Sequence, residues 1–213
     1  MTEPDHSAAA RLRRRLSAAD MARVAMFAAL IAVLGLPGSF SLFGNAVPIT
    51  LQTLGVLLAG AILGAWRGPL AVIVLLALVA AGLPLLAGGR GGLGVFAGPS
   101  VGYLIGWVVG AFVVGWIIER GGRRPGLHWV LSACLLGSAL ILLIGVPIQA
   151  LVTGVPLATT AKLSLAFVPG DAIKSVLAAV VVKGVQRAYP EASPAVRRAR
   201  QAGDSGLPVH GPR

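Results

Sequence analysis

The longest uncharged segment of the chain is Trp129–Ala161, "WVLSACLLGSALILLIGVPIQALVTGVPLATTA". A helix needs about 20 apolar residues to cross a bilayer core, so this stretch is long enough to span a membrane. Four more uncharged stretches precede it: Val24–Leu42, Ala46–Trp66, Pro69–Gly89 and Gly91–Ile118. A sixth apolar stretch, Ala172–Val182, contains Lys174 and reaches spanning length only if it starts near Asp171 and runs to about Tyr189, with Lys183 at the lipid headgroups. The sequence therefore predicts an all-α integral membrane protein, a compact bundle of six transmembrane helices.

Composition and charge support this prediction. The chain is 56% hydrophobic and 12% charged, with a mean hydropathy of +0.86, and its apolar stretches lack the polar faces of a soluble bundle. Fifteen of the 18 Lys and Arg residues fall on one side of a six-span topology, and Arg90 and Lys162 fall on the other. By the positive-inside rule both termini are cytoplasmic. The net charge of +11 therefore reflects topology rather than nucleic-acid binding.

This topology divides the chain into three parts. Residues 1–20 are a basic cytoplasmic tail, residues 21–189 are the membrane domain, and residues 190–213 are a second basic cytoplasmic tail. No signal-peptide cleavage site stands out near the N-terminus. Trp66, Trp116 and Trp129 fall at predicted cytoplasmic span ends, as interfacial tryptophans do.

The stretch "FVPGDAIKSVL", residues 167–177, carries the candidate site. Asp171 and Lys174 are three residues apart, which places them on one face of a helix. A charge at membrane depth costs at least about 2.5 kcal/mol, so such residues usually face a cavity and have a partner. Asp171 has a second interpretation as a helix N-cap after Pro169 and Gly170. Capping leaves Lys174 unexplained, because a cation near a helix N-terminus meets an unfavourable dipole.

Two further segments on the predicted outer side are candidates for binding. The glycine-rich stretch Gly82–Tyr103 contains Phe96, Tyr103 and a single charge, Arg90. A binding role for it is favoured over a flexible turn, because loops on rigid scaffolds often carry function. The run "TLQT" at residues 50–53 adds Thr50 and Gln52, for which hydrogen bonding between helices is an equal alternative.

Small residues indicate close helix packing. Gly98, Gly102, Gly106 and Gly110 recur every four residues, and Gly60 and Gly64 repeat this spacing in an earlier span. Both sets are expected to pack within the chain.

The first span has a small-residue surface of its own. Ala25 and Ala29 lie one helical turn apart there. They either pack inside the bundle or contact another subunit, and the residues alone leave both alternatives open.

Three blocks together resemble the BioY family, the biotin-binding S components of energy-coupling factor (ECF) vitamin transporters. They are "VPITLQTLGVLLAGAILG" (47–64), "GLPLLAGGRGGLGVFAGPSVGYLIGW" (82–107) and "FVPGDAIKSVLAAV" (167–180). The resemblance implies biotin uptake across the cytoplasmic membrane of a prokaryote. It also implies docking, through Ala25 and Ala29, on a transmembrane coupling subunit that is driven by two ATPase subunits. The chain departs from the family pattern at "PLLA" (84–87) and at Ser100 and Val101.

The chemistry of biotin matches the candidate residues. Its ureido ring has two N–H donors and one carbonyl, and its tail ends in a carboxylate. Asp171 accepts hydrogen bonds, Lys174 and Arg90 donate them, and Tyr103 and Phe96 offer ring surfaces to the apolar bicycle.

Other functions were weighed against this one. The nearest alternative is another vitamin of the same transporter family, and the next is a stand-alone ion-coupled carrier, for which one carboxylate supplies no proton relay. We expect no enzyme, because the spans lack a catalytic constellation and the chain lacks a P-loop. No cofactor or metal site is expected.

Overall fold

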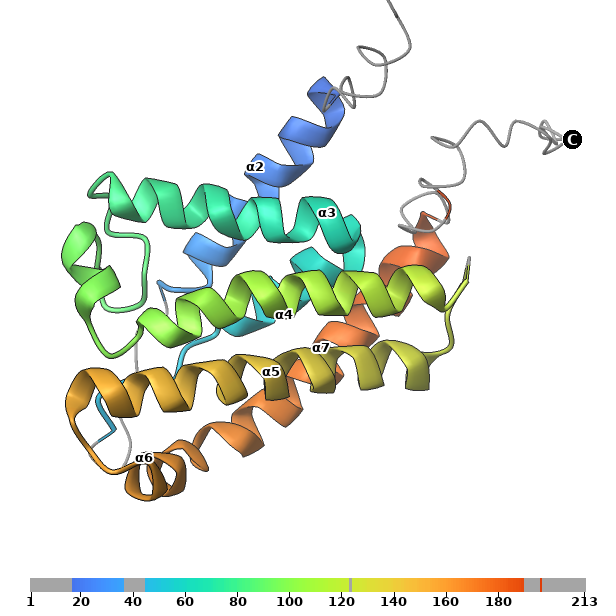
Figure 1. Ribbon diagram of the computed structural model, residues 1–213. Coiled ribbons are helices and arrows are strands. Elements are labelled where there is room, and N and C mark those ends of the chain that lie inside the picture. The colour runs from blue at the N-terminus through green and yellow to red at the C-terminus, as the bar shows by residue number, and fades with distance from the viewer. Residues whose placement is uncertain (1–16, 37–44, 123, 190–195, 197–213) are drawn as a thin grey trace, which may run out of the picture.

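A computed structural model describes residues 17–36, 45–122, 124–189 and 196 of the chain (Figure 1). These residues form an all-α membrane-protein fold, and the predicted fold class is confirmed. Most of the predicted tails, residues 1–20 and 190–213, lie outside the described residues. The described part contains six α-helices and one 3-10 helix: α2 (Ala18–Val33), α3 (Gln52–Ala80), η1 (Leu93–Ala97), α4 (Val101–Arg120), α5 (Leu127–Thr153), α6 (Leu157–Ser164) and α7 (Phe167–Ala188).

Helix α3 reverses its direction at Gly64, where φ is 90° and ψ is −179°. This conformation is essentially restricted to glycine. A Cβ added at Gly68 would lie 2.8 Å from the Cα of Gly60, whereas eight residues of straight helix cover about 12 Å. Gln52, at the start of α3, also hydrogen-bonds Leu85 beyond its end. The helix is therefore two antiparallel arms, which correspond to the second and third predicted spans.

By length and composition, three of the described helices are able to cross a membrane: α3, α4 and α5. The bent pair α6 and α7, which meet at 47°, gives a fourth. Helix α3 counts as one helix here, although its two arms run in opposite directions. The remaining predicted span corresponds to α2, and residues 37–42 of its predicted range lie outside the described residues.

Several predicted boundaries were wrong, because apolar loops continue the hydrophobic runs beyond the helices. The uncharged stretches Pro69–Gly89 and Gly91–Ile118 run past the helices, because residues 81–92 form a loop and η1 precedes α4, which begins only at Val101. The loop predicted at Gly82–Tyr103 is thereby confirmed as far as Ser100. The fifth predicted span is divided at Gly154, whose left-handed conformation (φ 68°) ends α5 before α6 begins. Hydropathy does not distinguish a spanning helix from an apolar loop that is covered by the protein.

The close packing predicted for the glycine ridge, the set Gly98, Gly102, Gly106 and Gly110, is confirmed for three of the four glycines. A Cβ added at Gly102, Gly106 or Gly110 would lie between 2.6 and 3.0 Å from Ile148 or Ile141 of α5. Gly98 is not part of the ridge, since it follows η1 and precedes α4.

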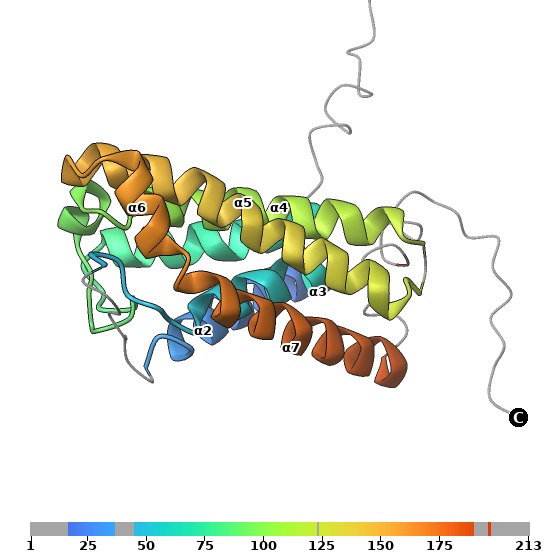
Figure 2. The same ribbon diagram turned by 90° about the horizontal axis from the view of Figure 1, so that it is seen from below.

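In the second predicted set, Gly60 packs against α4 while Gly64 serves as the hinge of α3. A Cβ at Gly60 would lie 2.5 Å from the carbonyl oxygen of Ala111. Helix α3 also packs against α2 and α7, and α5 packs against α4 and α7 (Figure 2). The glycine contacts lie within the chain, as predicted.

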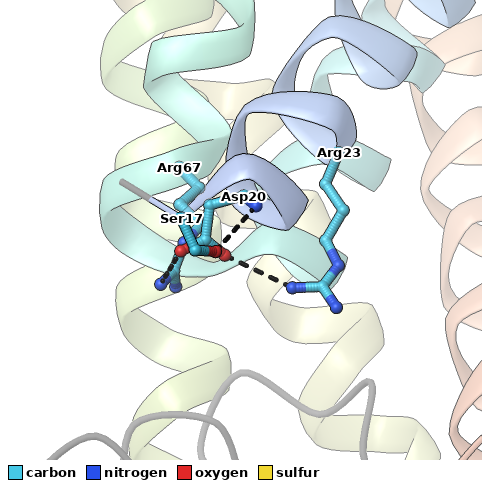
Figure 3. A network of polar contacts seen from close by, with 4 residues as sticks. All are labelled: Ser17, Asp20, Arg23 and Arg67. Atoms are coloured by element: carbon cyan, nitrogen blue, oxygen red, sulfur yellow. Dashed lines mark hydrogen bonds and ion pairs between the residues drawn. The ribbon is translucent and has the colours of Figure 1, made fainter. Parts of the chain in front are cut away.

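One end of the bundle is held by charged groups around the hinge of α3. Asp20 of α2 accepts from Arg67 of α3, with Oδ2 and Nη2 3.0 Å apart, and also pairs with Arg23 (Figure 3). Glu119 of α4 accepts the backbone N–H of Ala65, the first residue after the hinge. These contacts fasten α2 and α4 to the point where α3 reverses.

The same end carries most of the basic residues of the described chain. Lys183 of α7 donates to the carbonyl of Pro125 in the turn between α4 and α5. Trp66 is 73% exposed beside the hinge, and Trp129 donates to Ile117 in the last turn of α4. Arg90 and Lys162 lie at the opposite end, with η1 and α6. The predicted separation of charge therefore corresponds to the two ends of the bundle.

Candidate functional site

A cleft opens at the end of the bundle that carries η1 and α6. It holds about 540 Å³ of empty space when the open solvent at its mouth is included. Residues from α3, α4, α5 and α7, from the segment before α3 and from the glycine-rich loop line it: Val47, Pro48, Thr50, Gln52, Thr53, Leu86, Arg90, Ser100, Tyr103, Leu104, Trp107, Ile141, Leu142, Phe167, Asp171 and Lys174. The cleft thus brings together segments that are far apart in the sequence.

Asp171 and Lys174 form an ion pair in the wall of the cleft. Lys174 Nζ donates to Asp171 Oδ1 over 3.0 Å, and the two residues are only 6% and 5% exposed. The alternative that Asp171 caps the helix was wrong. Helix α7 begins at Phe167 and its N-cap is Ala166, so Asp171 lies past the first turn. The pairing therefore follows from the spacing of the two residues on one helix face.

Lys174 has a second partner on another helix. Its Nζ also donates to the hydroxyl of Thr53 in α3, over 3.3 Å. An ammonium has three protons, so one remains for another acceptor. A buried charge is stable only when it is paired and hydrogen-bonded, and both conditions are met here.

Arg90 reaches the cleft from the loop between α3 and α4. Its Nε donates to the carbonyl of Ala87, and its Nη1 donates to the hydroxyl of Ser100, each over 3.1 Å. Burial lowers the pKa of the guanidinium, which still carries its charge at neutral pH. The glycine-rich stretch therefore supplies a fixed cation to the cleft.

Tyr103 of α4 belongs to a polar network behind the cleft. Its hydroxyl donates to Gln149 Oε1 over 2.8 Å and lies 3.4 Å from the hydroxyl of Ser164. Gln149 in turn donates to Asn45 Oδ1 over 2.8 Å. The Tyr103 ring lies against Phe167, with centroids 5.8 Å apart, so the two rings form an apolar part of the wall.

The remaining candidates have different positions. Thr50 lines the cleft and accepts the backbone N–H of Gln52 over 3.3 Å. The side-chain amide of Gln52 bonds to backbone groups with both of its protons: its nitrogen donates to the carbonyls of Ile31 and Leu85. Its oxygen accepts from the N–H of Ala87. Phe96 lies in η1, half-buried against the core, and is not among the residues that line the cleft.

Ala25 and Ala29 are both exposed on α2, whose buried face is formed by Val24, Phe27 and Ile31. The alternative that these alanines pack inside the bundle was therefore wrong. Whether this face meets a partner subunit stays a prediction.

Thr53, the last residue of the run "TLQT", lies beside Lys174. Sequence reasoning missed three residues that complete the site: Ser100 beside Arg90, Trp107 in the wall, and Gln149 behind Tyr103. Gln149 is a carboxamide inside an otherwise apolar helix, which was a signal that it has a partner. The others gave no such signal, because their partners are distant in the sequence.

The arrangement suits a small ligand with both polar and apolar parts. One carboxylate offers acceptors, two cations offer donors, and aromatic and aliphatic side chains form the rest of the wall. Clefts of this kind bind by shape and fix the orientation of the ligand through a few polar groups.

Comparisons with known proteins agree with this architecture. The chain is 44% identical to a biotin transporter BioY of Rhizobium etli over 181 residues, covering 82% of this chain and 97% of that protein. It is 46% identical to a biotin transporter BioY of Rhodobacter capsulatus, covering 79% and 94%. A crystal structure of the S-component for biotin from an ECF-type ABC transporter matches with a TM-score of 0.77 and 31% identity, covering 83% and 95%. The BioY family model matches residues 7–191, and the chain therefore belongs to the BioY family.

Proposed function

We propose that this protein binds biotin in the cleft and serves as the S component of an ECF transporter. In this proposal it lies in the cytoplasmic membrane of a prokaryote. It passes biotin inward after docking on a transmembrane coupling subunit that is driven by two ATPase subunits. The relatives named above support the substrate. The observation that carries the proposal is the buried pair of Asp171 and Lys174 in the wall of the cleft.

The chemistry of the cleft fits the polar groups of biotin. Asp171 is the carboxylate among the cleft-lining residues, and it accepts from a ureido N–H. Lys174 and Arg90 supply the donors for the ring carbonyl and for the carboxylate of the tail. Hydrogen bonds to ionised groups are the strong ones, so three such contacts account for tight binding. Tyr103, Trp107 and Leu142 cover the apolar bicycle.

The orientation in the membrane follows from charge. The end of the bundle around the α3 hinge carries Arg67, Arg120 and Lys183, so we place it on the cytoplasmic side. The cleft then opens outward, where free biotin arrives. The alanine face of α2 is the proposed docking surface, because small side chains allow another helix to approach closely.

Titration of labelled biotin into the purified protein tests the substrate. Competition with unlabelled biotin, thiamine and riboflavin separates biotin from the other vitamins. We expect displacement by biotin alone, and displacement by thiamine or riboflavin would favour the alternative substrate. Biotin uptake by cells with and without the coupling module separates an S component, which depends on the module, from a stand-alone ion-coupled carrier, which does not.

A further inference from the structure

The side-chain amide of Gln52 joins three segments that are distant in the sequence. Gln52 is 1% exposed at the start of α3. Its Nε2 donates to the carbonyls of Ile31 and Leu85 over 3.2 and 3.0 Å, and its Oε1 accepts the N–H of Ala87 over 3.0 Å. Both amide protons are thus used within the chain, which leaves no donor for a ligand.

On one side, Gln52 completes the end of α2. The last four carbonyls of a helix have no partner within it. At the end of α2, the carbonyls of residues 30, 32 and 33 accept from the backbone N–H groups of Leu34, Gly35 and Leu36, respectively. The remaining carbonyl, that of Ile31, accepts from the side-chain amide of Gln52. A Cβ added at Gly35 would lie 2.9 Å from the Nε2 of Gln52, so the glycine makes room for this amide.

On the other side, Gln52 holds the loop that carries Arg90. Its two contacts there, with Leu85 and Ala87, flank Leu86. Leu86 and Arg90 pair through both backbone groups, over 3.0 and 3.2 Å. The guanidinium of Arg90 then bonds back to the carbonyl of Ala87 and faces the cleft. A continuous set of hydrogen bonds therefore runs from the end of α2 to the cation in the cleft.

We propose that Gln52 is a positioning residue, which sets Arg90 in the cleft and ties its loop to the end of α2. The proposal rests on the proposed function, since the consequence measured is the affinity for biotin. Two other roles are possible for a buried amide at this place. One is direct contact with the ligand, and the other is general support of the fold. Both predict an effect on binding that does not depend on Arg90.

A double-mutant cycle separates these roles, because residues that act through one another have non-additive effects. The change Gln52→Met keeps the length of the side chain and removes all three hydrogen bonds. We expect it to weaken biotin binding about tenfold, the order of one charged hydrogen bond. With Arg90→Met already present, the further loss should be less than about threefold. With Lys174→Met present, it should again be about tenfold.

Gly35→Ala is the second variant, and it decides the question if Gln52→Met does not fold. It displaces the amide from the side of α2 without removing a polar group. Its effect on binding should likewise disappear in the Arg90→Met background. Gln186→Met is the matched control, because Gln186 is a buried glutamine at the opposite end of the bundle. It is expected to alter the melting temperature and not the affinity.

Wild-type protein in the same titration tests the proposed function separately from this inference. If the wild type binds biotin and Gln52→Met weakens biotin binding equally in all backgrounds, the positioning role is overturned, and biotin binding by the protein still stands. Wild-type affinity of the Gln52→Met protein would also overturn it. Absence of biotin binding by the wild type would instead overturn the proposed function. The proposal requires that Gln52→Met weakens biotin binding only in proteins that still contain Arg90.

Discussion

Lys174 reaches back one turn of α7 to Asp171 and across to Thr53 of α3, so one ammonium links the two walls of the cleft. The contact within α7 follows from the helix period alone. The contact with Thr53 joins residues 121 positions apart in the chain. The ion pair is thus fixed from two directions before any ligand arrives, which reduces the ordering that binding requires.

The first prediction concerns this pair. Asp171→Asn keeps the shape of the side chain and replaces a charged acceptor with a neutral amide. Charged hydrogen bonds contribute about 1.5–3 kcal/mol, so biotin binding should weaken roughly tenfold to a hundredfold. Lys174→Met, which keeps the apolar stem, should cause a loss of the same order. Titration of each purified variant measures the affinity.

A thermal melt without ligand is the control for these two variants. Each variant leaves a buried charge without its ion-pair partner, so some fall in melting temperature is expected beside the loss of affinity. Near-normal affinity together with a large fall in melting temperature would mean that the pair is structural and that biotin is held elsewhere.

The second prediction concerns the exposed alanines of α2. Ala25→Trp or Ala29→Trp should abolish ATP-driven uptake and leave biotin binding intact, since a protruding ring prevents close approach of another helix. Uptake is measured in cells that contain the coupling module, and binding is measured on purified protein. Leu143→Trp on α5 is the control, as this side chain is 69% exposed on a different helix. Normal uptake by the alanine variants would place the docking surface elsewhere.

The third prediction concerns orientation in the membrane. Cysteines at positions 93 and 128, introduced one at a time, lie at exposed sites on opposite ends of the bundle. They are placed in a Cys134→Ala background, which removes the natural cysteine of the chain. A membrane-impermeant thiol reagent applied to whole cells should label position 93 alone. Permeabilised cells, in which both positions should react, provide the control, and labelling of position 128 in intact cells would reverse the proposed topology.

The fourth prediction concerns the hinge of α3. Gly64→Ala forces a Cβ onto a backbone with φ of 90°, which costs on the order of 1–3 kcal/mol. The melting temperature in detergent should fall accordingly. Gly184→Ala is the matched control, because a Cβ there meets nothing within 4 Å and alanine favours helix. An unchanged melting temperature for Gly64→Ala would show that the reversal tolerates other conformations.

Features that depend on local composition and on the helix period were predictable from the sequence. Uncharged stretches of about 20 residues predict membrane spans, and the distribution of Lys and Arg separates the two ends of the bundle. The spacing of Asp171 and Lys174 places them on one face, because residues three apart are neighbours on any helix. The resemblance to the BioY family rested on three blocks of sequence, and the family match confirmed it.

Contacts between residues distant in the sequence became visible only in the folded chain. The tertiary structure brought Thr53 to Lys174, Gln149 to Tyr103, and Gln52 to the loop of Arg90. It also showed that Phe96 packs beside the cleft rather than in it, and that α3 turns back at Gly64. The physical reason is that hydropathy measures how readily each segment enters lipid. The pairing of segments depends on close packing and on hydrogen bonds between helices, which are complete only when all of the helices are in place.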